Sequence, residues 1–262
     1  MSRPARLYVP EALHHRKLPA HRVGHPADMP VMIRGDEGSL LAHGPRSLTR
    51  ASLRQGARAL AARDPDLARV LDHLGEPPLW GRRPGFAALV RIILEQQVSL
   101  AAARTMYRRL HCHLGGMTAE GIYALSVAGL RELGLTRQKA AYCHGLAARV
   151  VNGSLDLAAT ARLPDDVGRR TLLAVPGLGP WSVDIYYLMA LRRPDVWPEG
   201  DLALAAALRD VKRMDTLPTK EAQEALTSGW APWRSVAARI LWTHYLTARG
   251  QYSPRPDNMA GL

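Results

Sequence analysis

Cysteine is scarce in this sequence of 262 residues, which contains only Cys112 and Cys143. Two thiols cannot build a disulfide framework, a zinc site with four thiolates or an iron–sulfur cluster held by four cysteines. Long apolar runs are also lacking, since the stretch 86–94 is interrupted by Arg91 and falls far short of the roughly 20 residues that span a bilayer. We therefore expect a protein of a reducing cytoplasm, with no transmembrane segment and no membrane partner.

Acidic residues are too few to balance the basic ones. The sequence has 23 Asp and Glu against 35 Lys and Arg, which gives a net charge of +12, and its isoelectric point is near 10.4. This excess favours polyanionic partners such as nucleic acid, and a solvated basic surface without a specific partner is the alternative. Hydrophobic residues make up 47% of the chain, which is ample for a buried core.

The N-terminal segment differs in composition from the rest of the chain. Several prolines interrupt it, and Glu11 is its only acidic residue before Asp28. We interpret residues 1–48 as a basic, disordered tail. They lack the apolar core of a secretory signal, and their proline content argues against the amphipathic helix of a transit peptide. Met29 or Met32 is an alternative start of the chain.

Strand patterns are absent, because no stretch alternates β-branched and polar residues between hairpin turns. Apolar residues instead recur with helical spacing, as in the segment FAALVRIILE that begins at Phe86. Residues 51–75 predict two short helices, the second opened by Asp64 and Pro65 and closed by Gly75. We therefore expect an all-α fold with short connections. The other predicted helices cover residues 86–99, 100–114, 119–125, 137–151, 165–174, 202–213, 220–228 and 233–248.

A cluster of proline and glycine, VPGLGP at residues 175–180, separates two helical stretches. Pro176 ends the first helix, and Pro180 suits the first turn of the next one. Gly177 and Gly179 are expected to supply the positive φ angles of a tight turn. The sequence thus predicts a helix-hairpin-helix whose amides, at the start of the second helix, can bind a phosphate oxygen. An inert corner between two helices is the alternative.

Several segments together resemble a known family. The stretch LLAVPGLGPWSVDIYYLMA is followed about twenty residues after the hairpin by WPEGDLAL. This pair resembles the helix-hairpin-helix DNA glycosylase superfamily, with its Gly/Pro-rich loop and essential aspartate. The stretches LVRIILEQQVSLAAA, LGLTRQKAAYCHGLA and APWRSVAARILWTHYL resemble its alkylpurine branch, the 3-methyladenine DNA glycosylase II type. The resemblance extends over about residues 67–246 and does not cover the tail.

The resemblance implies two helical lobes with a DNA-binding cleft between them. Residues 49–83 and 209–262 would form one lobe, and residues 84–208 would form the other, with the hairpin and the catalytic acid. The implied function is a monofunctional, monomeric DNA glycosylase of base excision repair in the bacterial nucleoid. It would flip alkylated purines such as 3-methyladenine out of damaged double-stranded DNA and hydrolyse their N-glycosidic bonds. A glycosylase for deaminated or mispaired bases and a catalytically silent helix-hairpin-helix DNA-binding protein are the alternatives.

By resemblance, Asp201 is the catalytic aspartate. Loss of a base develops positive charge on the deoxyribose, and a carboxylate in a poorly solvated site stabilises that charge and can orient or deprotonate the attacking water. A plain helix-capping role for Asp201 is the alternative, and the two roles are compatible. Glu199 is the nearest rival for the catalytic role.

Resemblance also assigns roles to two tryptophans. Trp181 occupies the position where bifunctional relatives carry a nucleophilic lysine, and an indole cannot form a Schiff base, so we expect water to be the nucleophile. Trp242 and Trp181 are expected to line the base pocket and to stack on a cationic purine. A core role is the alternative for Trp242. The remaining tryptophans that we interpret as structural are Trp80, Trp230 and Trp233.

The remaining expected contacts to DNA lie at the hairpin and at a pair of glutamines. Gly177, Leu178 and Gly179 would bind phosphate, and Gln97, beside Gln96, would fill the gap left by the extruded nucleotide. The family's hairpin also binds a structural Na⁺ or K⁺ ion through main-chain carbonyls, without any required cofactor or iron–sulfur cluster. The matching carbonyls, implied by the resemblance alone, are those of Leu173, Val175 and Leu178. Ser182 and Asp184 are expected only to cap the second helix.

Overall fold

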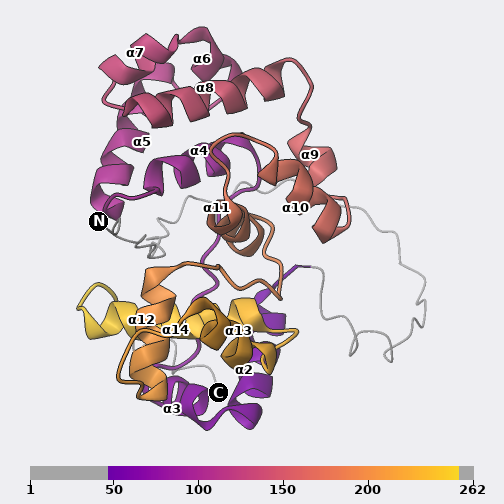
Figure 1. The fold of residues 1–262 in the computed structure, drawn as a ribbon, viewed down its shortest axis with the longest axis vertical. Coiled ribbons are helices and arrows are strands. Elements are labelled where there is room, and N and C mark those ends of the chain that lie inside the picture. Colours follow the sequence, from indigo (N-terminus) through magenta and orange to yellow (C-terminus); the bar gives the residue numbers. More distant parts are fainter. Residues whose placement is uncertain (1–46, 254–262) are drawn as a thin grey trace, which may run out of the picture.

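The computed structural model describes residues 47–253, which are coloured in Figure 1. Within this range the chain has thirteen α-helices, one π-helical turn and no strand, so the predicted all-α fold is confirmed. No helix of these residues is both long and apolar enough to cross a membrane. The elements are α2 (Arg50–Arg63), α3 (Pro65–Leu74), α4 (Phe86–Glu95), α5 (Leu100–Leu114), α6 (Ala119–Ala124), α7 (Val127–Glu132), α8 (Arg137–Val151), α9 (Leu157–Thr160), α10 (Asp165–Leu173), α11 (Pro180–Ile185), η1 (Tyr186–Ala190), α12 (Leu202–Lys212), α13 (Lys220–Ser228) and α14 (Arg234–Ala248).

Helix ends agree with prediction where the sequence carries a clear cap. Asp64 is the N-cap of α3, and its Oδ1 accepts hydrogen bonds from the amides of Asp66 at 3.0 Å and Leu67 at 3.2 Å. Pro65 is the first residue of this helix, and Gly75 follows its last. A carboxylate that binds free amides, followed by a proline that needs no partner, fixes the start of the helix.

The sequence analysis was wrong where a helix is short or ends without punctuation. It missed α7 and α9, which have six and four residues, although it predicted α6, which is as short as α7. Such lengths are too short to show a clear repeat of apolar positions, so the prediction of these helices is uneven. It also extended the first helix of the 86–114 region too far. That helix, α4, ends at Glu95 because its C-cap residue Gln96 is extended, with a ψ of 125°, and Gln97 then has a φ of 58°, so neither residue continues the right-handed helix.

Figure 1 shows two groups of helices with α11 between them. In one group α8 packs on α4, α6 and α7, and in the other α14 packs on α2, α3 and α12. The expected boundary between the lobes, at residues 208 and 209, falls inside α12. This helix packs on α14 and α3 and so lies with the second group.

The prediction of a tail that reaches residue 48 is wrong for its last two residues. Residues 1–46 lie outside the described part of the chain, but the next two residues belong to the fold. Leu48 is buried, and its amide donates to the carbonyl of Arg192 at 2.7 Å. The Ser47 hydroxyl donates to the carbonyl of Leu191 at 3.2 Å. Burial of an apolar side chain therefore anchors the chain just before α2.

The segment that follows the hairpin runs through the middle of the molecule. Every residue from 181 to 191 is buried, within one apolar core that includes residues of both helix groups. Beside it, the fully buried guanidinium of Arg239 on α14 donates to the carbonyls of Leu188 at 2.9 Å and Trp80 at 3.2 Å. Because a close-packed interior resists displacement, α11 and η1 provide a fixed base for the hairpin.

Candidate active site

Asp201 lies at the N-cap of α12, after Gly200 with a φ of 76°. Its Oδ1 atom accepts a hydrogen bond from the amide of Leu204 at 3.0 Å, so the expected capping role is confirmed. The residue is 0% exposed. Capping leaves lone pairs on both carboxylate oxygens, so Asp201 can accept further hydrogen bonds.

Two tryptophans from different helices donate hydrogen bonds to this carboxylate. Trp181 Nε1 of α11 lies 3.1 Å from Oδ2, and Trp242 Nε1 of α14 lies 3.3 Å from Oδ1. Both indoles are buried, Trp242 completely. The structure thus brings together the three residues to which the sequence analysis assigned catalysis and base binding, and it orients both indole N–H groups toward the acid.

Burial governs the electrostatics of Asp201. Loss of hydration raises the pKa of Asp201 from 3.8 to about 7, while the hydrogen bonds from Leu204, Trp181 and Trp242 act in the opposite direction. The positive end of α12 also favours the anion. Among the described residues, no basic side chain forms an ion pair with this carboxylate. Asp201 therefore titrates near neutral pH.

Glu199 does not join this group. Its side chain is half exposed and forms an ion pair with Lys220 at 2.8 Å. Its main-chain amide donates to Asp184 Oδ2 at 3.3 Å. A hydrated, paired carboxylate is a weaker source of electrostatic stabilisation than a buried one, so the geometry favours Asp201 over Glu199.

The two glycines of the hairpin have different conformations. Gly177 has a φ of 92°, and a Cβ atom there would lie 2.4 Å from the ring of Tyr142 on α8, so only glycine fits. Gly179 is extended, with φ −83° and ψ 176°, because Pro180 disfavours other conformations of the residue before it. The expectation of a positive φ at Gly179 is therefore wrong. A Cβ atom at Gly179 would meet open space.

The carbonyls expected to bind a cation lie at the end of α10 and in the turn. Leu173 is the last residue of α10, where helix carbonyls lack intrahelical partners. The Val175 carbonyl accepts the Leu178 amide at 3.0 Å and keeps one lone pair. Such oxygens fit a hard monovalent ion. The described residues contain no group of three or more His, Cys, Asp or Glu that could hold a metal.

The adjacent glutamines have different environments. Gln96 Nε2 donates to the Gly177 carbonyl at 2.8 Å and to the Ser182 hydroxyl at 2.9 Å, so its side chain is attached to the hairpin. Gln97 is exposed and has a φ of 58°, which is unusual for a residue with a Cβ atom. The sequence analysis missed the attachment by Gln96, and no local pattern could have revealed it.

Ser182 and Asp184 do not cap α11, contrary to expectation. The N-cap residue is Gly179, and no side chain caps this helix. Ser182 instead accepts the hydrogen bond from Gln96, and Asp184 forms an ion pair with Arg169 of α10. Burial raises the pKa of Asp184, and the Arg169 charge partly offsets this effect. Both residues therefore tie the hairpin to its surroundings.

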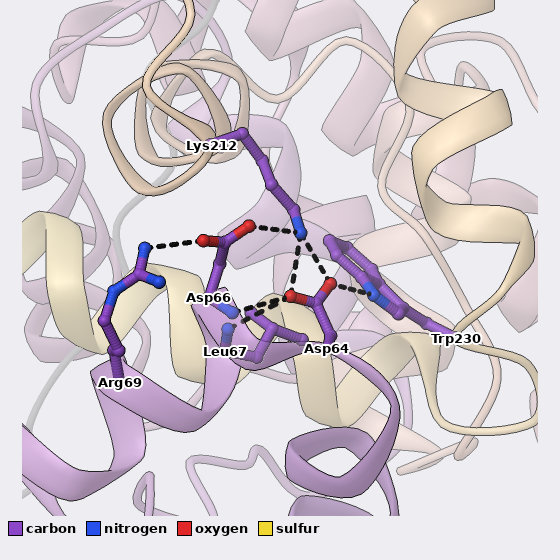
Figure 2. Close-up of polar contacts among 6 residues, drawn as sticks. All are labelled: Asp64, Asp66, Leu67, Arg69, Lys212 and Trp230. Atoms are coloured by element: carbon purple, nitrogen blue, oxygen red, sulfur yellow. Dashed lines mark hydrogen bonds and ion pairs between the residues drawn. The ribbon is translucent and has the colours of Figure 1, made fainter.

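The far end of α12, the helix that Asp201 caps, is also fixed. Figure 2 shows Lys212 above Asp64 and Asp66, with Trp230 beside them. Lys212 Nζ lies 2.7 Å from both Asp64 oxygens and 2.9 Å from Asp66 Oδ2, and Trp230 Nε1 donates to Asp64 Oδ2 at 2.8 Å. Trp230 is thus structural, as expected, and α12 is held at both ends.

Comparison with known proteins gives the family of the chain. A model described as HhH-GPD superfamily base excision DNA repair protein matches residues 90–232, more than half of the sequence. A protein of Mycobacterium tuberculosis, "Probable bifunctional transcriptional activator/DNA repair enzyme AlkA", is 30% identical over 235 residues, covering 80% of this chain and 46% of that protein.

Two further similarities agree. A Bacillus subtilis protein named DNA-3-methyladenine glycosylase is 25% identical over 169 residues, covering 60% of this chain and 56% of that protein. The chain thus spans about half the length of these two curated relatives. A structure of the 3-methyladenine DNA glycosylase of Schizosaccharomyces pombe in complex with abasic DNA is 24% identical, with a TM-score of 0.68 over 76% of this chain and 99% of that one. The chain belongs to the HhH-GPD superfamily of base excision DNA repair proteins.

Proposed function

We propose that the protein is a monofunctional DNA glycosylase that hydrolyses the N-glycosidic bond of alkylated purines such as 3-methyladenine in damaged double-stranded DNA. The observation that carries the proposal is the fully buried Asp201 carboxylate, held by Trp181 and Trp242 at the N-terminus of α12. The names of relatives support the substrate, and their bacterial origin supports action on nucleoid DNA in the cytoplasm.

The chemistry follows from the charge of this carboxylate. Cleavage of the N-glycosidic bond moves the bonding electron pair onto the base and leaves positive charge on the deoxyribose. Ionised Asp201 stabilises that charge strongly, because few water molecules screen it. Water then adds to the sugar C1′, and its proton passes to Asp201, which leaves an abasic site. Because Asp201 is 0% exposed, the side chains that cover it must move when the extruded nucleotide enters.

The lysines support water as the nucleophile. Residues 47–253 contain three lysines, and each is engaged elsewhere. Lys139 donates to the carbonyl of Leu94, Lys212 binds Asp64 and Asp66, and Lys220 pairs with Glu199. Trp181 stands beside the acid where an amine nucleophile would be needed. The reaction therefore proceeds without a Schiff base and without strand cleavage.

Base selection rests on the two indoles. Their N–H edges point toward Asp201. Trp181 is 3% and Trp242 0% exposed, so a base would meet their ring faces only after the side chains that cover them move. Purines alkylated on ring nitrogens are cationic, which favours stacking on an electron-rich face, and they leave readily without a strong general acid. A neutral deaminated base lacks both properties.

DNA contacts come from the hairpin and from Gln97. The main chain of Gly177, Leu178 and Gly179 approaches phosphate, and a Na⁺ or K⁺ ion on the carbonyls of Leu173, Val175 and Leu178 would add positive charge there. Gln97 fills the gap left by the nucleotide, a role supported by its exposure and its strained φ. Because one chain supplies the hairpin, Gln97 and Asp201, we propose that it acts as a monomer.

The test is base release from duplexes that carry 3-methyladenine or 7-methylguanine, uracil, or adenine opposite an oxidised guanine. We expect methylated purines to be released and borohydride to trap no covalent adduct. Asp201→Asn should lower the rate of release by about a hundredfold to a thousandfold, and Glu199→Gln should leave it nearly unchanged. Release of only uracil or mispaired adenine would contradict the substrate, and duplex binding without any release would indicate a catalytically silent DNA-binding protein.

A further inference from the structure

Three consecutive residues at the end of α4 are each held by a different part of the molecule. The carbonyl of Leu94 accepts a hydrogen bond from Lys139 of α8. The buried carboxylate of Glu95 pairs with the guanidinium groups of two arginines, at 2.8 Å and 3.2 Å. Gln96 donates its hydrogen bonds to the hairpin segment. The backbone is therefore fixed up to the exposed residue Gln97.

Gln96 connects the end of α4 to two parts of the hairpin segment. Its Nε2 atom lies 2.8 Å from the Gly177 carbonyl, in the turn, and 2.9 Å from the Ser182 hydroxyl, on α11. Ser182 is fully buried and directly follows Trp181, whose indole donates to Asp201. One side chain thus joins the residue before Gln97 both to the turn and to the helix that carries a residue of the expected base pocket.

The bond from Gln96 also fixes the orientation of the turn. The carbonyl of Gly177 accepts this bond. The N–H of the same peptide unit, which is that of Leu178, donates to the Val175 carbonyl at 3.0 Å. Because a peptide unit is planar, bonds at both of its ends hold its plane in place. Loss of the Gln96 bond would leave this plane held at one end.

The backbone of Gln97 is held in an unfavourable conformation. A φ of 58° is disfavoured for a residue with a Cβ atom, and such a conformation persists only where the surrounding structure holds it. Gln96, the residue directly before it, is anchored by two hydrogen bonds. Without them the backbone could relax toward a more common conformation, and the side chain of Gln97 would then point elsewhere.

We propose that Gln96 is a positioning residue, which keeps Gln97 and the hairpin in a fixed relation so that one duplex engages both. Binding of a phosphate at the hairpin then places Gln97 at the gap in the base stack, and the binding free energy of the hairpin supports extrusion of the nucleotide. Gln96 acts through Gln97 and not through contact with DNA. This inference rests on the proposed function, which identifies the duplex as the partner and Gln97 as the residue that fills the gap.

The test compares two glutamines that both donate to a main-chain carbonyl. Gln96→Met keeps the length of the side chain and removes its N–H donors. Gln223→Met is the matched control, because Gln223 Nε2 donates to the Pro218 carbonyl at 3.1 Å and lies on α13, in the other helix group (Figure 1). Single-turnover excision of 7-methylguanine is measured at saturating enzyme. One substrate is a paired duplex, and in the other the lesion is a bulge without an opposite nucleotide.

Gln96→Met should lower excision from the paired duplex by about tenfold, the effect of losing two hydrogen bonds. The loss should be much smaller for the bulge, because an unpaired nucleotide leaves the stack readily and leaves no gap to fill. Gln223→Met should leave both rates unchanged. Ser182→Ala, which removes one of the two acceptors of Gln96, should show the same pattern with a smaller loss. Equal losses in both substrates would overturn the proposal.

A double variant shows whether Gln96 acts through Gln97. If it does, Gln96→Met combined with Gln97→Ala should excise as slowly as Gln97→Ala alone. Effects of independent residues would instead multiply. A multiplied loss in the double variant would assign Gln96 a separate role and would overturn the proposal.

A readout that needs no activity separates this inference from the proposed function. In a duplex with an abasic analogue, the fluorescence of 2-aminopurine beside the gap reports the insertion of a side chain. The change on protein binding should be lost in Gln97→Ala, reduced in Gln96→Met and kept in Gln223→Met. If the wild-type protein releases no base but this order holds, the glycosylase assignment fails and the positioning role stands. Equal changes for Gln96→Met and the wild-type protein would overturn the positioning role.

Discussion

Two aspartates in this protein occupy the same local structure and differ in their surroundings. Asp64 and Asp201 are both buried N-cap residues, and each accepts a hydrogen bond from an indole N–H. Asp64 also binds Lys212, as Figure 2 shows, whereas Asp201 forms no ion pair with a described residue and has a second indole, Trp242, in that place.

The cation reverses the effect of burial on the acid. Burial raises the pKa of Asp64, but the hydrogen bonds from Lys212 and Trp230 and the Lys212 charge bring it below 3.8. At Asp201 burial prevails, and the pKa is about 7. The capping carboxylate of Asp64, neutralised by a lysine, therefore stabilises the fold. The capping carboxylate of Asp201 has no such cation, so its charge remains available to stabilise a cationic transition state.

The largest expected effect separates the two acids by activity. Asp201→Asn should lower single-turnover excision of methylated purines by about a hundredfold to a thousandfold, since a neutral amide cannot stabilise the developing cation. Asp64→Asn should leave excision per folded molecule nearly unchanged. Comparable losses per folded molecule in the two variants would show that the loss is not specific to Asp201 and would contradict its assignment as the catalytic acid.

The second prediction removes the cation of Asp64. Lys212→Met should lower the free energy of unfolding by about 3 kcal/mol, because it leaves a largely buried carboxylate without its partner. Lys220→Met is the matched control, and it should cost less than about 1 kcal/mol because its partner Glu199 is half exposed. Urea denaturation measures both. Equal changes would mean that Lys212 does not neutralise Asp64.

The third prediction concerns pH and has opposite signs at the two sites. Excision should decline as the pH falls through about 7, where Asp201 takes up a proton. The free energy of unfolding, measured relative to Asp201→Asn, should decrease as the pH rises from about 4 to about 7, because the folded state holds this proton more tightly than the unfolded state. Relative to Asp64→Asn, the stability that Asp64 contributes should be present above pH 3.8 and lost as the pH falls through its lowered pKa. Parallel pH profiles for the two comparisons would contradict this account.

The smallest expected effect comes from single indole donors. Trp181→Phe removes one hydrogen bond from the Asp201 carboxylate and keeps an aromatic face for the base. The midpoint of the pH profile of excision should move upward, with a few-fold loss at pH 7 that recovers at higher pH. Trp230→Phe, which removes the indole donor of Asp64, should leave this profile unchanged. A loss for Trp181→Phe that is the same at every pH would assign Trp181 to base binding alone.

Local sequence patterns predicted both caps and did not predict their partners. Asp64 precedes Pro65, and Asp201 follows Gly200 and precedes an apolar helix, so the backbone role of each is visible within a few residues. Lys212 lies 148 residues from Asp64, and Gln96 lies 81 residues from Gly177. Such contacts depend on how helices pack, and helical periodicity does not predict which helices pack against each other. Resemblance to a family, and not periodicity, indicated Trp181 and Trp242.

The number of residues in the π-helical turn η1 determines how the residues that follow it are oriented. The amide of Leu191 donates to the carbonyl of Tyr186, five residues back, where an α-helix would close over four. Beyond it, Arg193 Nε lies 2.7 Å from Asp165 Oδ1. Each residue turns a helix by about 100°, so deletion of one residue within η1 would rotate Arg193 away from Asp165. Only an adjustment of the loop before Asp201 could restore this ion pair. Apolar substitutions in this turn should be tolerated far better than any change in its number of residues.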